Sequence, residues 1–275
     1  MICAWKQLLS ILPPEIGAQV DRLGKETLQE LRLRLNAPPE MVTGSGSVWL
    51  KGTVRKENLD YVVNSASRYS PWCASTMAQG YLTAPGGHRI GICGDAVWNA
   101  DVPGSFQRFT SLCIRVARDY PRAADRISDT RESILIVGAP GWGKTTLLRD
   151  LARRIASDCV VSVVDERGEL YPDGFQRGKR MDVLYGFPKP RGMDMVLRTM
   201  GPDYIAVDEI TADADCAALI QAANCGVRLI ATAHASGIQD LKRRPIYRSL
   251  LDSRVFQSFV LLKKDKSYCV ERVVS

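Results

Sequence analysis

The second half of the chain alternates short apolar runs with amphipathic stretches. The runs are rich in β-branched residues and are mostly continuous, which is typical of strands buried on both faces. They lie at 133–138, 160–166, 204–210, 227–234 and 259–264. The stretch 145–157, between the first two runs, carries leucines and an isoleucine at the spacing of one helix face. This rhythm predicts an α/β fold, with a parallel sheet covered by helices on both sides.

The N-terminal stretch predicts a helix and then a strand. Trp5, Leu8 and Leu12 are spaced for one helix face, and the proline pair at 13–14 should end that helix. At 28–36, apolar residues come to alternate with basic ones, which is typical of a half-buried strand.

Four further segments complete an α+β pattern in the first part of the chain. Residues 48–50 predict a short strand, and 57–80 has helical spacing. The segment 80–98 predicts a hairpin whose turn is the Pro-Gly-Gly sequence at 85–87. At 111–119, apolar residues again alternate with the others, as in a strand with one buried face.

A polar stretch separates the two patterns. Residues 119–132 include one proline and are interpreted as a linker. The sequence therefore predicts a smaller N-terminal α+β domain at 1–125 and a second, α/β domain at 126–275.

The composition is that of a folded protein, but it does not indicate a particular function. The chain has 275 residues, of which 45% are hydrophobic and 24% charged, so a disordered or low-complexity chain is excluded. The net charge of +7 is spread over both halves, and no basic arm stands out. Charge alone is therefore weak support for nucleic-acid binding.

Cysteine usage and apolar runs bear on metals and location. The eight cysteines form no CxxC pair and only two histidines are present, so the sequence predicts no structural zinc site. No signal-peptide pattern opens the chain, and no apolar run approaches the roughly 20 residues that span a bilayer. We expect a cytoplasmic protein with reduced thiols and no direct membrane span.

A phosphate-binding loop is the most specific motif. The sequence GAPGWGKT at 138–145 follows an apolar strand, precedes an amphipathic helix and fits G-x-x-x-x-G-K-[ST]. Glycines let backbone N–H groups converge on phosphate oxygens. Lys144 would reach the terminal phosphates, and Thr145 would bind Mg²⁺. The predicted nucleotide-binding residues are Gly138, Ala139, Pro140, Gly141, Trp142, Gly143, Lys144, Thr145 and Thr146.

Two adjacent acids follow a second buried strand. The run 204–210 contains Asp208 and Glu209, and an acid at the carboxyl end of a parallel strand faces the ligand crevice. We assign Asp208 to the magnesium and Glu209 to the activation of the attacking water. A water-activating acid beside a metal ligand favours hydrolysis over a simple nucleotide switch.

Two more strand ends offer polar side chains. Asp165, Glu166 and Glu169 lie at or just beyond the end of the run 160–166. Thr232 and His234 end the run 227–234. Because these strands belong to the same predicted sheet, His234 should lie on the edge that carries Lys144, where it would sense the γ-phosphate or its water.

The motifs, taken in order, resemble those of a known group of motors. GAPGWGKTT, VVDERGEL, YIAVDEI and ATAHA resemble the Walker A, Asp-box, Walker B and His-box motifs of the type II/type IV secretion and pilus-motor ATPases. Within that group, ELRLRLNAPPE, GYLTAPGGHRIGICGD, SLCIRVAR, KPRGMDMVLRTMGPDYIAVDEI and QAANCGVRLIATAHA resemble the stage III sporulation protein AA family of endospore-forming bacteria. The resemblance covers nearly the whole chain.

This resemblance implies a RecA-like P-loop ATPase core and a set of catalytic residues. The Asp-box acid falls on Glu166, the Walker B pair on Asp208 and Glu209, and the His-box histidine on His234. Arg115 and Arg118 match the arginines that the family's N-terminal domain brings toward the nucleotide, and Arg198 matches a further family arginine just before the Walker B strand. A guanidinium there would neutralise charge that grows on the leaving phosphate.

The resemblance also implies partners and a role. It implies a homo-oligomer, a hexameric ring, whose N-terminal domains move against the ATPase domains. We expect an Mg²⁺-dependent ATPase that energises a secretion-like channel during endospore formation, docked at the membrane through a membrane protein of that channel. A nucleic-acid translocase or helicase is the alternative, because it shares the fold, but no basic–aromatic groove pattern supports it. A non-hydrolytic, nucleotide-gated assembly factor is a third possibility.

Overall fold

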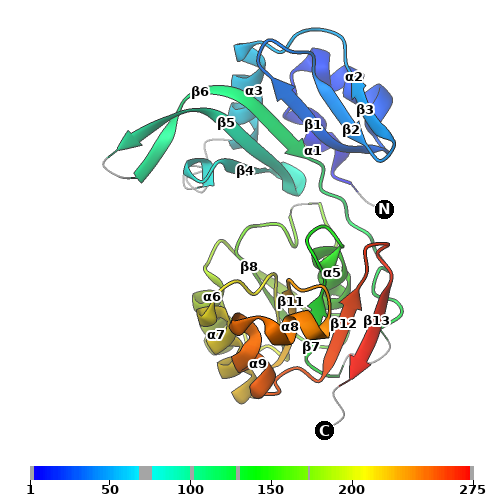
Figure 1. The fold of residues 1–275 in the computed structure, drawn as a ribbon, viewed down its shortest axis with the longest axis vertical. Helices are drawn as coiled ribbons and strands as arrows, with labels where there is room; N and C mark the ends of the chain where they lie inside the picture. The colour runs from blue at the N-terminus through cyan, green and yellow to red at the C-terminus, as the bar shows by residue number, and fades with distance from the viewer. Residues whose placement is uncertain (1–2, 68–75, 100–101, 128–130, 173, 273–275) are drawn as a thin grey trace. The chain divides into compact units, whose positions relative to one another are not determined.

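The chain forms two compact units (Figure 1). The computed structural model describes residues 3–67, 76–99, 102–127, 131–172 and 174–272. One unit comprises Met1–Asp119 with Pro172–Phe175, and the other comprises Tyr120–Tyr171 with Gln176–Ser275. Cys73, one of the eight cysteines, lies outside the described residues.

The first unit is built on an antiparallel sheet with the strand order β3-β2-β1-β6-β5-β4. Its strands are β1 (Leu28–Arg34), β2 (Glu40–Thr43), β3 (Gly46–Trp49), β4 (Tyr81–Ala84), β5 (His88–Asn99) and β6 (Val102–Arg115). Its helices are α1 (Trp5–Ser10), α2 (Pro14–Gly24) and α3 (Lys56–Ser67), with a 3-10 turn η1 (Pro85–Gly87). Leu31 and Leu33 of β1 and Leu112 and Ile114 of β6 are buried in its core, as the alternating pattern predicts.

The helix predicted before the proline pair at 13–14 ends at Ser10, as expected. A second helix, α2, which the sequence did not predict, begins at Pro14. Proline is favoured at the first helical position, because that residue's N–H has no partner within the helix and its φ is already helical.

The second unit carries the predicted parallel sheet, in the order β13-β12-β7-β11-β10-β8-β9. The pairings from β12 through β9 are parallel, and β13 joins β12 antiparallel. The strands are β7 (Ile134–Val137), β8 (Val161–Asp165), β9 (Met181–Tyr185), β10 (Tyr204–Val207), β11 (Arg228–Ala233), β12 (Ser258–Leu262) and β13 (Tyr268–Arg272). Every residue of β7, β8 and β10 is buried, as their continuous apolar runs predict.

Helices cover both faces of this sheet. They are α5 (Lys144–Ile155), α6 (Lys189–Thr199), α7 (Asp213–Asn224), α8 (Ile238–Arg243) and α9 (Arg248–Asp252), with a 3-10 turn η2 (Pro245–Tyr247). Alternate residues of β7 enter different cores: Ile134 and Ile136 pack with α5, whereas Leu135 and Val137 pack with α6 and α7. Among the described residues, no helix has both the length and the apolar character to cross a membrane.

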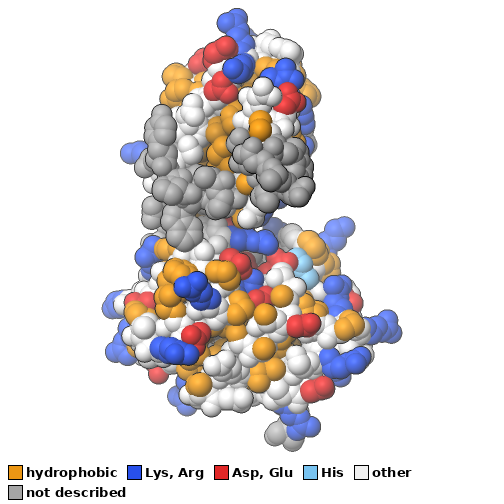
Figure 2. All heavy atoms as spheres, turned by 90° about the vertical axis from the view of Figure 1, so that its left-hand side faces the viewer, with side chains coloured by type: hydrophobic (Ala, Val, Ile, Leu, Met, Phe, Trp, Pro, Cys, Tyr) orange, Lys and Arg blue, Asp and Glu red, His pale blue; other side chains and the backbone are white. Residues whose placement is uncertain are grey.

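The first part of the predicted linker packs on the second unit. The carboxylate of Asp150 accepts the backbone N–H groups of Arg122 and Ala124, at 3.0 and 2.8 Å. Ala124 and Ile127 are buried in the core beside α5. On the face shown in Figure 2, the described acidic and basic side chains are interspersed.

Candidate nucleotide site

Four parallel strands bring the predicted motifs to one edge of the second sheet. Strands β7, β11, β10 and β8 lie side by side in that order. The phosphate loop follows β7, Thr232 and His234 lie at the end of β11, Asp208 follows β10, and Asp165 ends β8. Because the carboxyl ends of parallel strands meet at one edge, these side chains share one crevice.

The loop at 138–143 has the backbone that a phosphate cradle requires. Gly141 and Gly143 have φ values of 76° and 104°, a conformation that L residues with a Cβ rarely adopt. Gly143 is the N-cap of α5, so the loop delivers the chain to the positive end of a helix of 12 residues. Local backbone shape therefore agrees with the sequence motif.

Lys144 lies in this cradle as a buried residue. Its Nζ donates to the carbonyl oxygen of Ala139 at 3.1 Å. Burial lowers the pKa of Lys144 from its ordinary value, while the nearby carboxylates of Asp208 and Glu209 raise it. These two acids oppose the desolvation, so the ammonium and the acidic pair belong to one electrostatic cluster.

Asp208 is fixed by hydroxyl groups from two directions. Thr145 Oγ1 donates to Asp208 Oδ2 at 2.8 Å, and Thr232 Oγ1 donates to Asp208 Oδ1 at 2.7 Å. A threonine hydroxyl and a carboxylate are oxygen ligands of the kind that Mg²⁺ takes in phosphate sites. The residues predicted to hold the metal therefore lie together and fit it.

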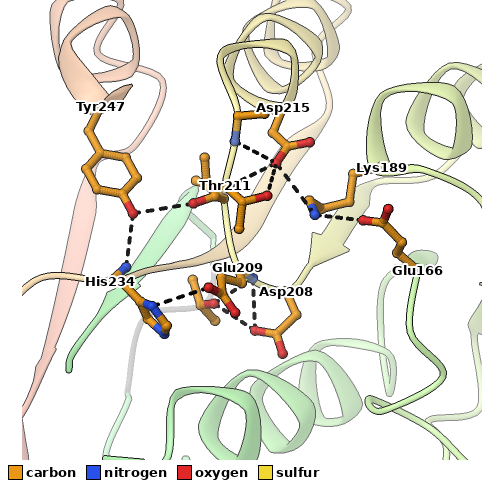
Figure 3. A network of polar contacts seen from close by, with 11 residues as sticks. Glu166, Lys189, Asp208, Glu209, Thr211, Asp215, His234 and Tyr247 are labelled. Carbon is orange, nitrogen blue, oxygen red and sulfur yellow. Dashed lines mark hydrogen bonds and ion pairs between the residues drawn. The ribbon is translucent and has the colours of Figure 1, made fainter. Parts of the chain in front are cut away.

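Glu209 occupies a strained backbone position. Its φ is 35°, which is uncommon for a residue with a side chain. Its N–H is held by Asp208 Oδ1 at 3.0 Å and by Thr232 Oγ1 at 2.8 Å. The turn directs its carboxylate to His234, whose Nδ1 lies 3.2 Å from Glu209 Oε1 (Figure 3).

His234 faces Glu209 as a neutral ring. Burial and then the charge of Lys144 lower the pKa of His234, against the opposing effect of the two acids. We assign the proton of the neutral ring to Nδ1, which then donates to Glu209. Tyr247, which the sequence did not single out, supports this pair: its hydroxyl accepts the backbone N–H of His234 at 3.1 Å and donates to the carbonyl of Ile210 at 3.4 Å.

Asp165 and Glu166, at the end of β8, have different roles. Asp165 is buried and holds the loop that follows, whereas Glu166 forms an ion pair. The Asp165 carboxylate accepts three backbone N–H groups, from residues 169, 170 and 171. Burial raises the pKa of Asp165, and these hydrogen bonds work against that rise. Glu166 instead pairs with Lys189, with Oε2 and Nζ 2.8 Å apart. Lys189 was not identified from the sequence, because it lies 23 positions farther along the chain.

Each of the three predicted arginines has a local partner. In the first unit, Arg115 pairs with Glu30 at 3.4 Å, and Arg118 donates to the carbonyl of Leu28 at 2.9 Å. In the second unit, Arg198 pairs with Asp194, one turn earlier in α6, at 2.9 Å. The catalytic role of Arg115 and Arg118 stays a prediction.

Arg198 does not reach the crevice within its own chain. It lies at the end of α6, just before β10 begins, and therefore at the edge where the parallel strands start. The phosphate loop lies at the opposite edge, where the strands end. Within its own chain Arg198 therefore lies at the sheet edge away from the phosphate loop, and its catalytic role stays a prediction.

Comparisons with known proteins agree with this fold and with the predicted resemblance. A family model described as sporulation stage III, protein AA, matches residues 6–272. Stage III sporulation protein AA of Bacillus subtilis (strain 168) is 32% identical over 282 residues, which cover 94% of this chain and 91% of that protein.

Two solved structures share the architecture. The Legionella pneumophila ATPase DotB superposes with a TM-score of 0.63 at 17% identity, over 95% of this chain and 80% of that one. The pilus retraction motor PilT, solved with bound ADP, gives a TM-score of 0.63 at 15% identity, over 90% and 76%. These likenesses confirm the predicted RecA-like α/β fold. With the family match over nearly its whole length, the chain belongs to the sporulation stage III protein AA family.

Proposed function

We propose that this protein is an Mg²⁺-dependent ATPase that energises a secretion-like channel during endospore formation. One observation carries the enzymatic part: the hydroxyl of Thr145 lies 2.8 Å from the carboxylate of Asp208, beside Lys144 in its glycine-rich cradle. A chance loop would have no reason to meet an acid 63 residues away. The family and the secretion-ATPase fold support the biological setting.

The chain supplies three kinds of contact to a triphosphate. The backbone N–H groups of the loop at 138–143 and the first turn of α5 would bind the phosphate oxygens. Lys144 would exchange its contact with the Ala139 carbonyl for the terminal phosphates. Thr145 and Asp208 would hold Mg²⁺, which when bound would neutralise phosphate charge.

Glu209 is the acid proposed to orient and deprotonate the attacking water. Its carboxylate is held on one side by His234, and its backbone by Asp208 and Thr232. A neutral His234 donates a hydrogen bond without adding a positive charge that would compete with Lys144. Glu166 would assist from the neighbouring strand once released from Lys189.

An apolar cavity beside the phosphate loop suits the nucleoside. Its volume is about 480 Å³, and its lining includes Tyr120, Trp142, Leu262 and Tyr268. Gly143 and Thr146 border the same cavity, so a phosphate chain on the loop leads directly into it. We propose that the adenine base stacks among these rings, because aromatic faces bind flat bases well.

The oligomer and its partners complete the proposal. Since Arg198 lies at the far edge of its own sheet, it would reach a nucleotide only on another copy, as a ring would allow. Arg115 and Arg118 would approach the phosphates from the first unit. We propose a homo-hexamer that docks on a membrane protein of the sporulation channel and stays peripheral to the membrane.

Hydrolysis by purified protein tests the enzymatic proposal. We expect ATP turnover that requires Mg²⁺, is abolished in K144A and is retained in K179A, which removes an exposed lysine of the same unit. Nucleotide binding can be followed through Trp142, which borders the cavity. E209Q should bind ATP normally and lose turnover by about 10²-fold or more. Full turnover by K144A would refute the proposal, and full biological function of E209Q would favour the non-hydrolytic assembly factor.

A further inference from the structure

Lys189 lies where a positive charge is unfavourable. It is the first residue of α6 and is only 7% exposed. The N-terminus of a helix carries partial positive charge, and an ammonium withdrawn from water needs partners. A residue that breaks local rules in this way commonly marks a functional site.

Two carboxylates compensate for this charge. Lys189 Nζ lies 2.8 Å from Glu166 Oε2 and 3.5 Å from Asp215 Oδ2 (Figure 3). Glu166 follows β8, and Asp215 belongs to the first turn of α7, which comes after β10. The ammonium therefore joins the loops that leave two neighbouring strands of the crevice.

Asp215 transmits this restraint to the loop that carries Glu209. Its Oδ2 accepts the N–H of Thr211 at 2.9 Å and the N–H of Ala212 at 3.2 Å. The Thr211 hydroxyl donates to the same oxygen at 3.2 Å. Because Thr211 is two residues beyond Glu209, any movement of Asp215 moves the backbone that directs the Glu209 carboxylate.

Close packing keeps Lys189 in place. A Cβ on Gly192 would lie 2.5 Å from Cγ1 of Val164, so the first turn of α6 rests directly on β8. The helix cannot slide away from β8 without opening this contact. Lys189 is thus held at a fixed height above the end of the strand.

We propose that Lys189 is a positioning residue for hydrolysis. It holds the Glu166 loop and the Glu209 loop at a fixed separation, and through Asp215 it orients the carboxylate that activates water. This inference rests on the proposed ATPase function and adds a residue that acts without contact with nucleotide.

Kinetics of K189M test this role. We expect kcat to fall about 10- to 100-fold, because small displacements of a catalytic group have large effects on rate. Nucleotide affinity, measured by Trp142 fluorescence, should stay within about threefold of the wild type. Hydrogen exchange of the backbone at 208–212 should become faster. The matched control, K179M, should change none of these quantities.

A second pair of variants separates positioning from simple charge balance. D215N should resemble K189M, and the double variant K189M/D215N should be no slower than the slower single variant, because both changes remove the same Lys189–Asp215 ion pair. Losses that add, or a double variant that regains wild-type kcat, would overturn the inference. If K189M does not fold, the charge-balanced double variant carries the test. A wild-type protein without turnover would contradict the proposed function, whereas normal kcat in K189M would contradict only the role of Lys189.

Discussion

Replacing Thr232 by valine should remove the hydroxyl that contacts Asp208 and Glu209, with little change in side-chain shape. Thr232 is fully buried, and its hydroxyl donates to Asp208 at 2.7 Å and accepts the Glu209 N–H at 2.8 Å. The first bond ends on a carboxylate and contributes about 1.5–3 kcal/mol, and the second about 0.5–1.5 kcal/mol. The Glu209 N–H keeps Asp208 as a partner at 3.0 Å, so it is not left unsatisfied.

T232V should therefore lower the free energy of unfolding moderately and lower kcat strongly. The added methyl group returns about 0.8 kcal/mol through apolar burial. The free energy of unfolding should fall by about 1–3 kcal/mol, while kcat should fall about 10- to 100-fold because Glu209 loses one of the two contacts that hold its N–H, and Asp208 loses a donor. T232S is the matched control: it keeps the hydroxyl, loses a methyl group and should keep kcat near that of the wild type. Urea unfolding and ATP turnover measure the two effects, and equal kcat values for T232V and T232S would refute the reasoning.

Three further predictions concern other parts of the chain. Burial lowers the pKa of His88 below its ordinary 6.5, so below that pH the unfolded chain binds a proton that the folded chain does not. The contribution of His88 to the free energy of unfolding should therefore be complete above pH 6.5 and decline as the pH falls toward the folded-state pKa. H88Q should lose this dependence in urea titrations. Burial raises the pKa of Cys216 to about 11, so iodoacetamide at pH 8 should label exposed Cys225 and spare Cys216, as mass spectrometry can show. G192A forces a methyl group against Val164 and should lower the free energy of unfolding by about 1–3 kcal/mol in urea.

In the second unit, the strands that the sequence predicted are those whose burial is visible in a local pattern. Strands β7, β8 and β10 are buried along their whole length and read as continuous apolar runs. The two edge strands, β9 and β13, were not predicted. Most residues of β13 are exposed, and β9 has no buried residue, so neither shows the signature of a central strand. An edge strand is set by pairing with its neighbour, and local sequence carries little of that information.

The residues of the candidate site were also only partly predictable from the sequence, for a different physical reason. Gly143, Lys144 and Thr145 lie in one short motif, so backbone shape and charge could be predicted together. Lys189 and Asp215 contribute to the site only because α6 and α7 pack side by side, which no spacing in the sequence reveals. The sequence nonetheless held one signal. Lys189 directly follows a proline and is the first residue of a helix, where its positive charge is unfavourable.

The backbone of Glu209 explains why so many contacts converge on one turn. A glutamate at a φ of 35° costs about 1–2 kcal/mol relative to an ordinary conformation, and it persists only where the surroundings enforce it. Its own N–H is held from two sides, the N–H of Ile210 is held by the Thr232 carbonyl at 2.9 Å, and the next residues are held by Asp215. A relaxed turn would need none of these bonds, but it would also let the carboxylate swing. The hydrogen bonds that enforce the strain are therefore the same ones that would direct the proposed acid toward an attacking water, so stability and the proposed catalysis depend on a single set of contacts.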